Sequence, residues 1–175
     1  TIVVRPPMSS PLVAEENTII GNTVLYGATD GYLFAAGRAG ERFCVRNSGA
    51  KVVIEGCGSN GCEYMTGGVA VILGEIGQNF GAGMTGGMAY IYDPDGTSRD
   101  ALNMETLVTV PVTVDHWENQ LKELVLRHAD ETSSTKAHQI LQNWETEKGN
   151  FIQICPKEML PHIPVPLSLE EDAIP

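Results

Sequence analysis

Four cysteines, Cys44, Cys57, Cys62 and Cys155, are the side chains with the clearest capacity for metal or redox chemistry. A zinc site normally combines a close Cys pair with a second pair or with histidines, and an iron–sulfur cluster needs three or four clustered thiolates. Cys57 and Cys62 are separated by four residues, and no histidine lies near them in the sequence. The spacing therefore favours small buried thiols in a reducing compartment over a metal site.

The segment from Gly81 to Gly87 contains a Gly-x-Gly-x-x-Gly string, a pattern that elsewhere binds a pyrophosphate. In a dinucleotide site this string opens a helix, whose N-terminus attracts the phosphates. Here it precedes residues 88–92, Met-Ala-Tyr-Ile-Tyr, which predict another strand. We therefore expect these glycines to form a corner of the chain and not a nucleotide site.

The other reactive side chains do not form a recognisable catalytic pattern. The histidines, His116, His128, His138 and His162, have no carboxylate partner repeated at helical spacing, so we expect surface or interface residues. No Ser-His-Asp or Cys-His spacing accompanies a nucleophile-bearing turn, and no carboxylate pair stands out. The sequence therefore predicts no catalytic, cofactor-binding or metal-binding residue in this chain.

The elements that position these side chains repeat at a fixed interval. One column of glycines opens four apolar strands, and a second column marks another corner in each turn. They are Gly31, Gly49, Gly68 and Gly87, and Gly40, Gly58 and Gly77. The strand openings lie 18, 19 and 19 residues apart (49 − 31, 68 − 49 and 87 − 68), which is typical of a solenoid. Because glycine permits sharp bends and close backbone contact, we predict a mainly β fold, a single-stranded parallel β-helix of about 18–19 residues per turn, followed by a helical pair.

Alternation within the strands predicts which side chains point out of the coil. We expect Lys51 and Glu55 to face water or a partner, which places Val53 outward as well. One period further on, Ile72 and Ile91 are predicted at the corresponding outward positions. Such an apolar face must be covered by the C-terminal part of this chain or by a neighbouring domain, so Val53, Ile72 and Ile91 are the candidate interface residues.

Asn60 and Asn79 are also 19 residues apart and are predicted to stack in successive turns. They form either a hydrogen-bonded amide ladder or two exposed turn residues.

Composition divides the chain into four parts. They are an extended N-terminal segment at 1–20, the β-helix at 21–110, a helical appendage at 111–160 and an extended acidic tail at 161–175. The formal net charge of −11 argues against nucleic acid or an anionic membrane surface as partner, and most of it lies beyond residue 92. No apolar run approaches the ~20 residues of a membrane span, and no signal-peptide pattern opens the sequence, so we expect a cytoplasmic protein.

The appendage is predicted in more detail from its periodicity. Helical spacing begins at Asp115, the expected N-cap of a first helix that ends near Ala129, and residues 132–134 are expected to cap a second. Short strands are predicted at 107–110 and 151–154.

Five strings closely resemble the C-terminal GXGXG domain of the glutamate synthase large subunit. They lie at 22–29, 39–43, 45–50, 62–68 and 79–84. The resemblance implies a right-handed β-helix in an enzyme that makes two glutamates from glutamine and 2-oxoglutarate, with FMN and an iron–sulfur cluster in other domains. The implied partners are the glutaminase and FMN-binding synthase domains, with a small subunit as a further candidate. The family usually has Asp-His where Ser59 and Asn60 stand, so no role carries over to that pair.

Two other function classes stay open beside this structural, interdomain role. One is the subunit-C-like β-helix of a formylmethanofuran dehydrogenase, against which the helical pair and the string at 62–68 speak. The other is a ligand- or carbohydrate-binding β-helix, which would display aligned side chains on an exposed face, whereas Phe34, Tyr90 and Tyr92 are predicted on the inward register. The sequence does not distinguish NADPH from ferredoxin as the electron donor.

Overall fold

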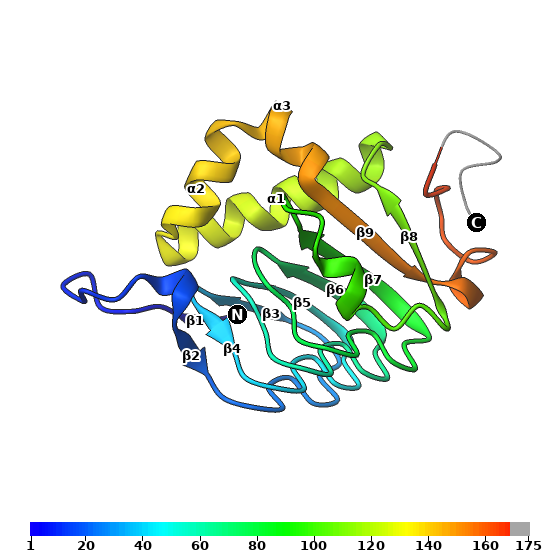
Figure 1. The fold of residues 1–175 in the computed structure, drawn as a ribbon, viewed down its shortest axis with the longest axis horizontal. Coiled ribbons are helices and arrows are strands. Elements are labelled where there is room, and N and C mark those ends of the chain that lie inside the picture. Colours follow the sequence, from blue (N-terminus) through cyan, green and yellow to red (C-terminus); the bar gives the residue numbers. More distant parts are fainter. Residues whose placement is uncertain (169–175) are drawn as a thin grey trace.

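The computed structural model describes residues 1–168 and shows a parallel β-helix of about 4 turns with helices along one side (Figure 1). The main sheet has seven strands in the order β1-β3-β5-β6-β7-β9-β8, and a smaller sheet pairs β2 with β4. The strands are β1 (Ile2–Val4), β2 (Thr18–Ile20), β3 (Tyr32–Ala35), β4 (Arg38–Ala39), β5 (Ser48–Ile54), β6 (Thr66–Ile72), β7 (Gly86–Tyr92), β8 (Leu107–Pro111) and β9 (Phe151–Pro156). The predicted fold class is therefore confirmed.

The last two strands close one end of the sheet. Strands β1, β3, β5, β6 and β7 run parallel, whereas β9 lies antiparallel to both β7 and β8. The strands predicted at 107–110 and 151–154 are thus confirmed, and the second one returns to the coil.

Many corners of the coil use residues other than glycine in the left-handed conformation. Within residues 1–168, nine coil residues of this kind have positive φ: Thr23, Leu25, Arg42, Cys44, Arg46, Asn60, Cys62, Tyr64 and Asn79. Ser133 has the same conformation at the C-terminal end of α1. In the corners, every second residue is left-handed. The N–H groups of successive left-handed residues donate to the following turn of the β-helix and to the preceding turn alternately. Arg42 N–H donates to Ser59 O at 2.8 Å in the next coil, and Cys44 N–H donates to Val24 O at 3.0 Å in the preceding one. These inter-coil hydrogen bonds offset the cost of the left-handed conformation.

The predicted glycine columns lie where coils approach each other. A Cβ atom on Gly49 would lie 2.0 Å from the carbonyl oxygen of Thr29, and one on Gly68, whose φ is +84°, would lie 2.3 Å from that of Ala50. In the second column, Gly40, Gly58 and Gly77 each donate their N–H to the preceding coil. Gly31 directly precedes β3, and Gly87 lies in β7.

The amide ladder is confirmed over the alternative of two unconnected turn residues. Asn79 Nδ2 donates to Asn60 Oδ1 at 2.9 Å, and Asn103 Nδ2 donates to Asn79 Oδ1 at 2.8 Å. The ladder therefore extends one step beyond the pair that the repeat predicts.

The register of the strands corrects the predicted outer column. Val53 pairs with Val71, only 18 residues on, because the β5–β6 pairing is irregular between Ser48 and Lys51. Ile72 and Ile91 therefore align with Ile54 and point into the coil. The prediction that Ile72 and Ile91 face outward is wrong, since a shift of one residue exchanges the two faces of a strand. Val53 does face outward, but this chain covers it completely.

The aromatic residues predicted to point inward lie on the outer face instead. Phe34 aligns with Val53, and Tyr90 aligns with Val71, so both belong to the cluster beneath the helices. Tyr92 packs against the same cluster. Tyr90 is anchored there because its hydroxyl donates to Gln120 Oε1 at 3.0 Å.

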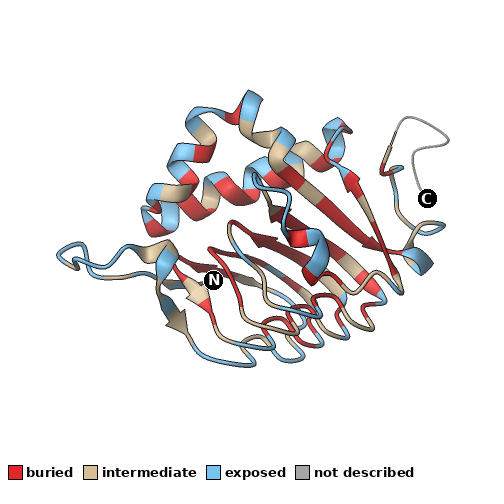
Figure 2. Ribbon diagram, viewed as in Figure 1, coloured by how far each residue is buried: buried red, intermediate tan, exposed pale blue. Residues whose placement is uncertain are grey.

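The C-terminal part of the chain covers this outer face with helices (Figures 1 and 2). The helices are α1 (Asp115–Thr132), α2 (Thr135–Gln142) and α3 (Trp144–Glu147), with short 3-10 turns at η1 (Ala14–Glu16), η2 (Ser98–Ala101), η3 (Lys148–Asn150) and η4 (Lys157–Met159). Both predicted helices are present. Asp115 is not the N-cap of α1, because it is the first helical residue after Val114 and no side chain caps that end. Ser134 does cap α2, accepting from Ala137 N–H.

Two apolar clusters result, one inside the coil and one between the sheet and the helices, and Figure 2 shows α1 buried on the side that faces the sheet. Of the predicted acidic tail, residues 161–168 pack on the second cluster: Leu167 is completely buried, and Trp117 Nε1 donates to Pro166 O at 3.0 Å. Residues 169–175, which carry the acidic run 170–172, lie outside the described residues. Within residues 1–168, no helix is both long and apolar enough to cross a membrane.

Candidate functional site

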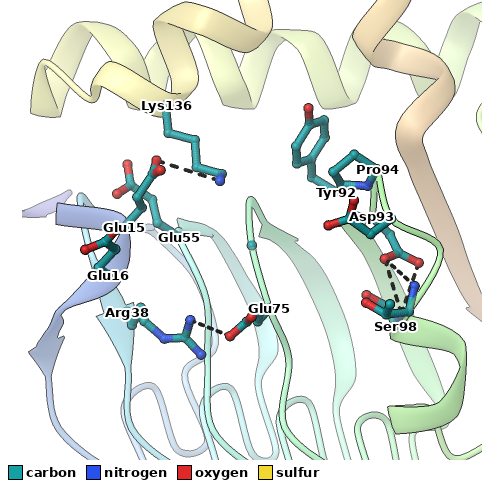
Figure 3. Close-up of a pocket in the computed structure, with 13 residues that line it drawn as sticks. Glu15, Glu16, Arg38, Glu55, Glu75, Tyr92, Asp93, Pro94, Ser98 and Lys136 are labelled. Carbon is teal, nitrogen blue, oxygen red and sulfur yellow. Dashed lines mark hydrogen bonds and ion pairs between the residues drawn. The ribbon is translucent and has the colours of Figure 1, made fainter. Parts of the chain in front are cut away.

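A cleft of about 450 Å³ lies where the parallel strands end, beneath α2 (Figure 3). Its walls come from η1, from the residues that follow β5, β6 and β7, and from α2. The charged side chains that line it are six carboxylates and two cations: Glu15, Glu16, Glu55, Glu75, Asp93, Asp95, Arg38 and Lys136. The cleft is therefore acidic, with cations too few to neutralise it.

The rim of the cleft is held by ion pairs and a capping carboxylate. Arg38 Nη1 lies 3.0 Å from Glu75 Oε2, and Lys136 Nζ lies 3.7 Å from Glu15 Oε2, a pair that links α2 to η1. Asp93 accepts the backbone N–H groups of residues 97 and 98, which starts η2. Exposed pairs of this kind are worth up to about 1 kcal/mol each, so the rim contributes mainly to orientation.

Glu55, which lines the cleft, belongs to a buried polar cluster with His128 and Ser134. His128 Nε2 lies 3.2 Å from Glu55 Oε1, and the Ser134 hydroxyl donates to the same oxygen. Ser134 Oγ also accepts from Ala137 N–H at 3.0 Å, which starts α2. The three side chains belong to residues that are 2%, 0% and 3% exposed. The cluster therefore joins the residue that follows β5 to both α1 and α2 through buried contacts.

These three residue types occur in hydrolase triads, but their connections here are different. In a triad the histidine takes the proton of the serine and the carboxylate orients the histidine. Here Glu55 bonds to both partners, no hydrogen bond joins His128 to Ser134 in the part of the chain that the structure describes, and the hydroxyl is buried. Among residues 1–168, the buried His128 Nδ1 has no hydrogen-bond partner. This geometry suits a structural role, in which the cluster fixes the helices to the coil.

Sequence reasoning missed this cluster. Glu55 is predicted to face water or a partner, yet it is buried, and its partners follow 73 and 79 residues later. The only local signal is the capping position of Ser134. No spacing rule connects a carboxylate after a strand to a histidine on a distant helix.

The four cysteines are buried free thiols, as predicted. Cys44, Cys57 and Cys62 lie inside the coil, and Cys155 lies in β9 beneath the helices. Burial raises the pKa of Cys57 to about 12 and that of Cys155 to about 11, and it also raises the pKa of Cys44. Among residues 1–168, no three or more His, Cys, Asp or Glu side chains are grouped so as to hold a metal ion.

Tyr92 forms a second contact between coil and helical layer, and it predicts a pH effect. Its hydroxyl donates to Glu147 Oε2 at 2.6 Å, and burial together with this bond raises the pKa of Tyr92 to about 12. An unfolded tyrosine titrates near pH 10. Between about pH 10 and 12 the unfolded state has lost this proton while the native state keeps it, so stability falls as pH rises. Urea midpoints measured across this range should fall less steeply for Tyr92→Phe than for the unaltered chain, and equal slopes would contradict the assignment.

The coil, its glycine columns and the covering helices together define the class: the chain belongs to the GXGXG motif family, whose model matches residues 1–157. The curated relatives are glutamate synthase large chains. The chain is 62% identical over 169 residues to the "Glutamate synthase [NADPH] large chain" of Azospirillum brasilense, covering 97% of this chain and 11% of that protein. It is 51% identical to the "Ferredoxin-dependent glutamate synthase" of Pyropia yezoensis, over 89% of this chain and 10% of the relative.

The chain thus spans about a tenth of the length of these relatives. The predicted resemblance is confirmed at the level of the family. Relatives named for NADPH and for ferredoxin both match. They favour the glutamate synthase interpretation over the formylmethanofuran dehydrogenase and carbohydrate-binding alternatives.

Proposed function

We propose that this chain is a structural domain of a glutamate synthase, the enzyme that forms two glutamates from glutamine and 2-oxoglutarate. The domain keeps the other domains of the large chain, the glutaminase and the FMN-binding synthase domain, at a fixed separation, so that ammonia passes between them without loss. It supplies no catalytic residue, and FMN and the iron–sulfur cluster belong to other domains. A small subunit is a further candidate partner, and the cytoplasm is the expected location.

The observation that carries this proposal is the buried Glu55 cluster. The carboxylate of Glu55, directly after β5, holds α1 through His128 and α2 through Ser134, so the coil and the helical layer move as one body. Within residues 1–168, His128 Nδ1 has no hydrogen-bond partner, but the Glu55 carboxylate is bonded to both His128 and Ser134. Buried polar contacts of this kind favour one arrangement of the layers over others. A rigid body of this kind suits a structural domain that has to hold the other domains a fixed distance apart.

The acidic outer surface of the helical layer is the candidate contact with the other domains. This contact cannot be made by Val53, Ile72 or Ile91, because all three are buried within this chain. Residues 93–175 carry 15 acidic and 6 basic side chains, and Glu123 and Asp130 lie exposed on α1. A partner surface with basic side chains would complement them.

Reversing two of these charges tests the proposal. The double substitution Glu123→Lys and Asp130→Lys in the full-length large chain should lower glutamine-dependent glutamate formation roughly fivefold or more and leave ammonia-dependent formation unchanged, the scale of a typical coupling between sites. Externally added ammonia does not need the transfer path, which is why the two activities separate.

The matched control reverses two exposed carboxylates away from α1, Glu41→Lys and Glu105→Lys, and should change neither activity. An equal loss of both activities in the α1 variant would indicate misfolding, and unchanged glutamine-dependent activity would remove the acidic surface from the proposal.

A further inference from the structure

Exposed aromatic and basic side chains meet at the corners of the coil, on the side away from the helices (Figure 1). They line a shallow depression of about 550 Å³, the corner hollow, which includes Tyr26, Arg46 and Tyr64. No carboxylate lines it, although the chain has a formal net charge of −11. Tyrosine and arginine are enriched where proteins bind each other, so the corner hollow is a candidate contact surface.

A column of left-handed residues, one from each coil, crosses the corner hollow. Backbone hydrogen bonds to the following coil align it: Gly27 N–H donates to Val45 O, Arg46 N–H to Glu63 O and Tyr64 N–H to Ala82 O. Gly83 is the next member, and all four residues have positive φ. The column therefore has a glycine at each end and two large side chains in the middle.

The two large side chains of the column are free to make further contacts. Within residues 1–168, the exposed Arg46 guanidinium makes no ion pair, and its Cζ lies 6.0 Å from the centre of the Tyr26 ring. A Cβ atom on Gly83 would lie 2.5 Å from Cδ1 and Cε1 of Tyr64, so this ring leans over the glycine. Tyr64 is still 51% exposed. A guanidinium and an aromatic ring thus stand side by side on the surface, one coil apart.

This column is complementary to itself when its direction is reversed. A two-fold axis perpendicular to the coil axis places Arg46 opposite the partner's Tyr64, and Tyr64 opposite the partner's Arg46. The glycine at each end then faces the glycine at the other end, which leaves room for the large side chains. A two-fold axis parallel to the coil axis would instead oppose the two Arg46 side chains, and like charges in contact are unfavourable.

We propose that two copies of the polypeptide associate through the corner hollow, with their coils antiparallel and each Arg46 guanidinium over the ring of the partner's Tyr64. Each such contact is a cation–π pair, and the symmetry forms it twice. The occupant is a second copy because the complement of this column is the same column reversed. The lack of carboxylates in the corner hollow also keeps two acidic chains from repelling each other there. The association goes beyond the proposed function, which concerns domains of one chain.

Cross-linking of the full-length polypeptide tests the contact. Thr66 lines the corner hollow in the same coil as Tyr64, close to the two-fold axis. A short bismaleimide should therefore join Thr66→Cys in one copy to Thr66→Cys in the other, and the four cysteines of this region are buried. Mass spectrometry of a mixture of isotope-labelled and unlabelled copies identifies links between copies. Glu105→Cys, which is exposed and lies outside the corner hollow, is the control and should give no such link.

Two substitutions made in the Thr66→Cys polypeptide test the orientation. Arg46→Glu removes the cation and Tyr64→Arg opposes two guanidinium groups, so each variant alone should lose roughly fivefold or more of the linked product. In a mixture of the two variants, the introduced carboxylate faces the introduced guanidinium, and the second contact keeps its original pair. The linked product should therefore recover. Arg46→Gln, which removes the charge and adds none, should show the same loss as Arg46→Glu with the circular dichroism spectrum unchanged.

Three results would overturn the inference. A Thr66→Cys link no stronger than that of Glu105→Cys would exclude the contact between copies. A link that persists in each single variant would exclude Arg46 and Tyr64 from the contact. A mixture that links no better than either variant alone would exclude the antiparallel arrangement. All three leave the proposed function untouched, because the experiment measures contact between copies and not glutamate formation.

Discussion

Replacing Glu55 with leucine is expected to lower the free energy of unfolding of this chain by about 3 kcal/mol, within the range measured when one partner of a buried polar or ionic pair is removed. The substitution leaves the buried His128 Nε2 and the buried Ser134 hydroxyl without their shared acceptor. It also loosens the contact of α1 and α2 with the end of β5. Urea unfolding followed by far-ultraviolet circular dichroism measures the change.

Two further variants separate this effect from a general loss of charge. Glu75→Leu removes a carboxylate whose side chain is 83% exposed and paired with Arg38, and it should cost less than about 1 kcal/mol. The double variant Glu55→Leu with His128→Leu should recover part of the loss, because two apolar side chains leave fewer unpaired polar groups. A Glu55→Leu chain as stable as the Glu75→Leu chain would show that the buried cluster does not hold the layers together.

Replacing Gly68 with alanine is expected to destabilise the coil by about 3 kcal/mol or more, the sum of left-handed backbone strain and overpacking against fixed atoms. The added Cβ would lie 2.3 Å from the carbonyl oxygen of Ala50, and the backbone φ of +84° disfavours any side chain. The obstructing atom is backbone in the neighbouring coil, so relief requires the coils to separate. Urea unfolding again measures the change.

Gly149→Ala is the matched control for this second prediction. A Cβ at Gly149 meets no atom within 4 Å, and the residue has no left-handed φ. The substitution should therefore shift stability by less than about 1 kcal/mol. A Gly68→Ala chain that unfolds at the same urea concentration as Gly149→Ala would show that the coils can part at low cost.

Taken together, the two substitutions distinguish two sources of rigidity. Gly68 sets how closely successive coils stack, and Glu55 fixes the helical layer on the stack. If the domain is a spacer, both variants should also impair glutamine-dependent glutamate formation, because either lesion lets the separation between the other domains vary.

The repeat of glycines predicted the architecture because it is a local property of the chain. A coil needs sharp corners and close backbone contact at regular intervals, and Gly49 and Gly68 satisfy that need where they stand. The helices at 115–132 and 135–142 were predictable for the same reason, since helical periodicity and the cap at Ser134 depend only on residues that are close in the sequence.

The register between neighbouring strands could not be predicted from residue types and their spacing. The period alternates between 18 and 19 residues, and the irregular pairing between Ser48 and Lys51 decides that Val53 faces the helices while Ile72 faces the coil. Alternation within one strand cannot show how far that strand is shifted against the next. The positive φ of non-glycine residues such as Arg42 could not be predicted either, because hydrogen bonds to neighbouring turns of the β-helix stabilise this conformation.

The amino-acid sequence alone determined the coil, its approximate period, the helical pair and the family, because each depends on residue types at short or regular spacing. Only the tertiary structure decided which face of each strand is covered and which distant polar groups meet. Glu55, His128 and Ser134 came together because α1 and α2 fold back onto the residue that follows β5. Long-range packing fixes these features, and no local pattern encodes them.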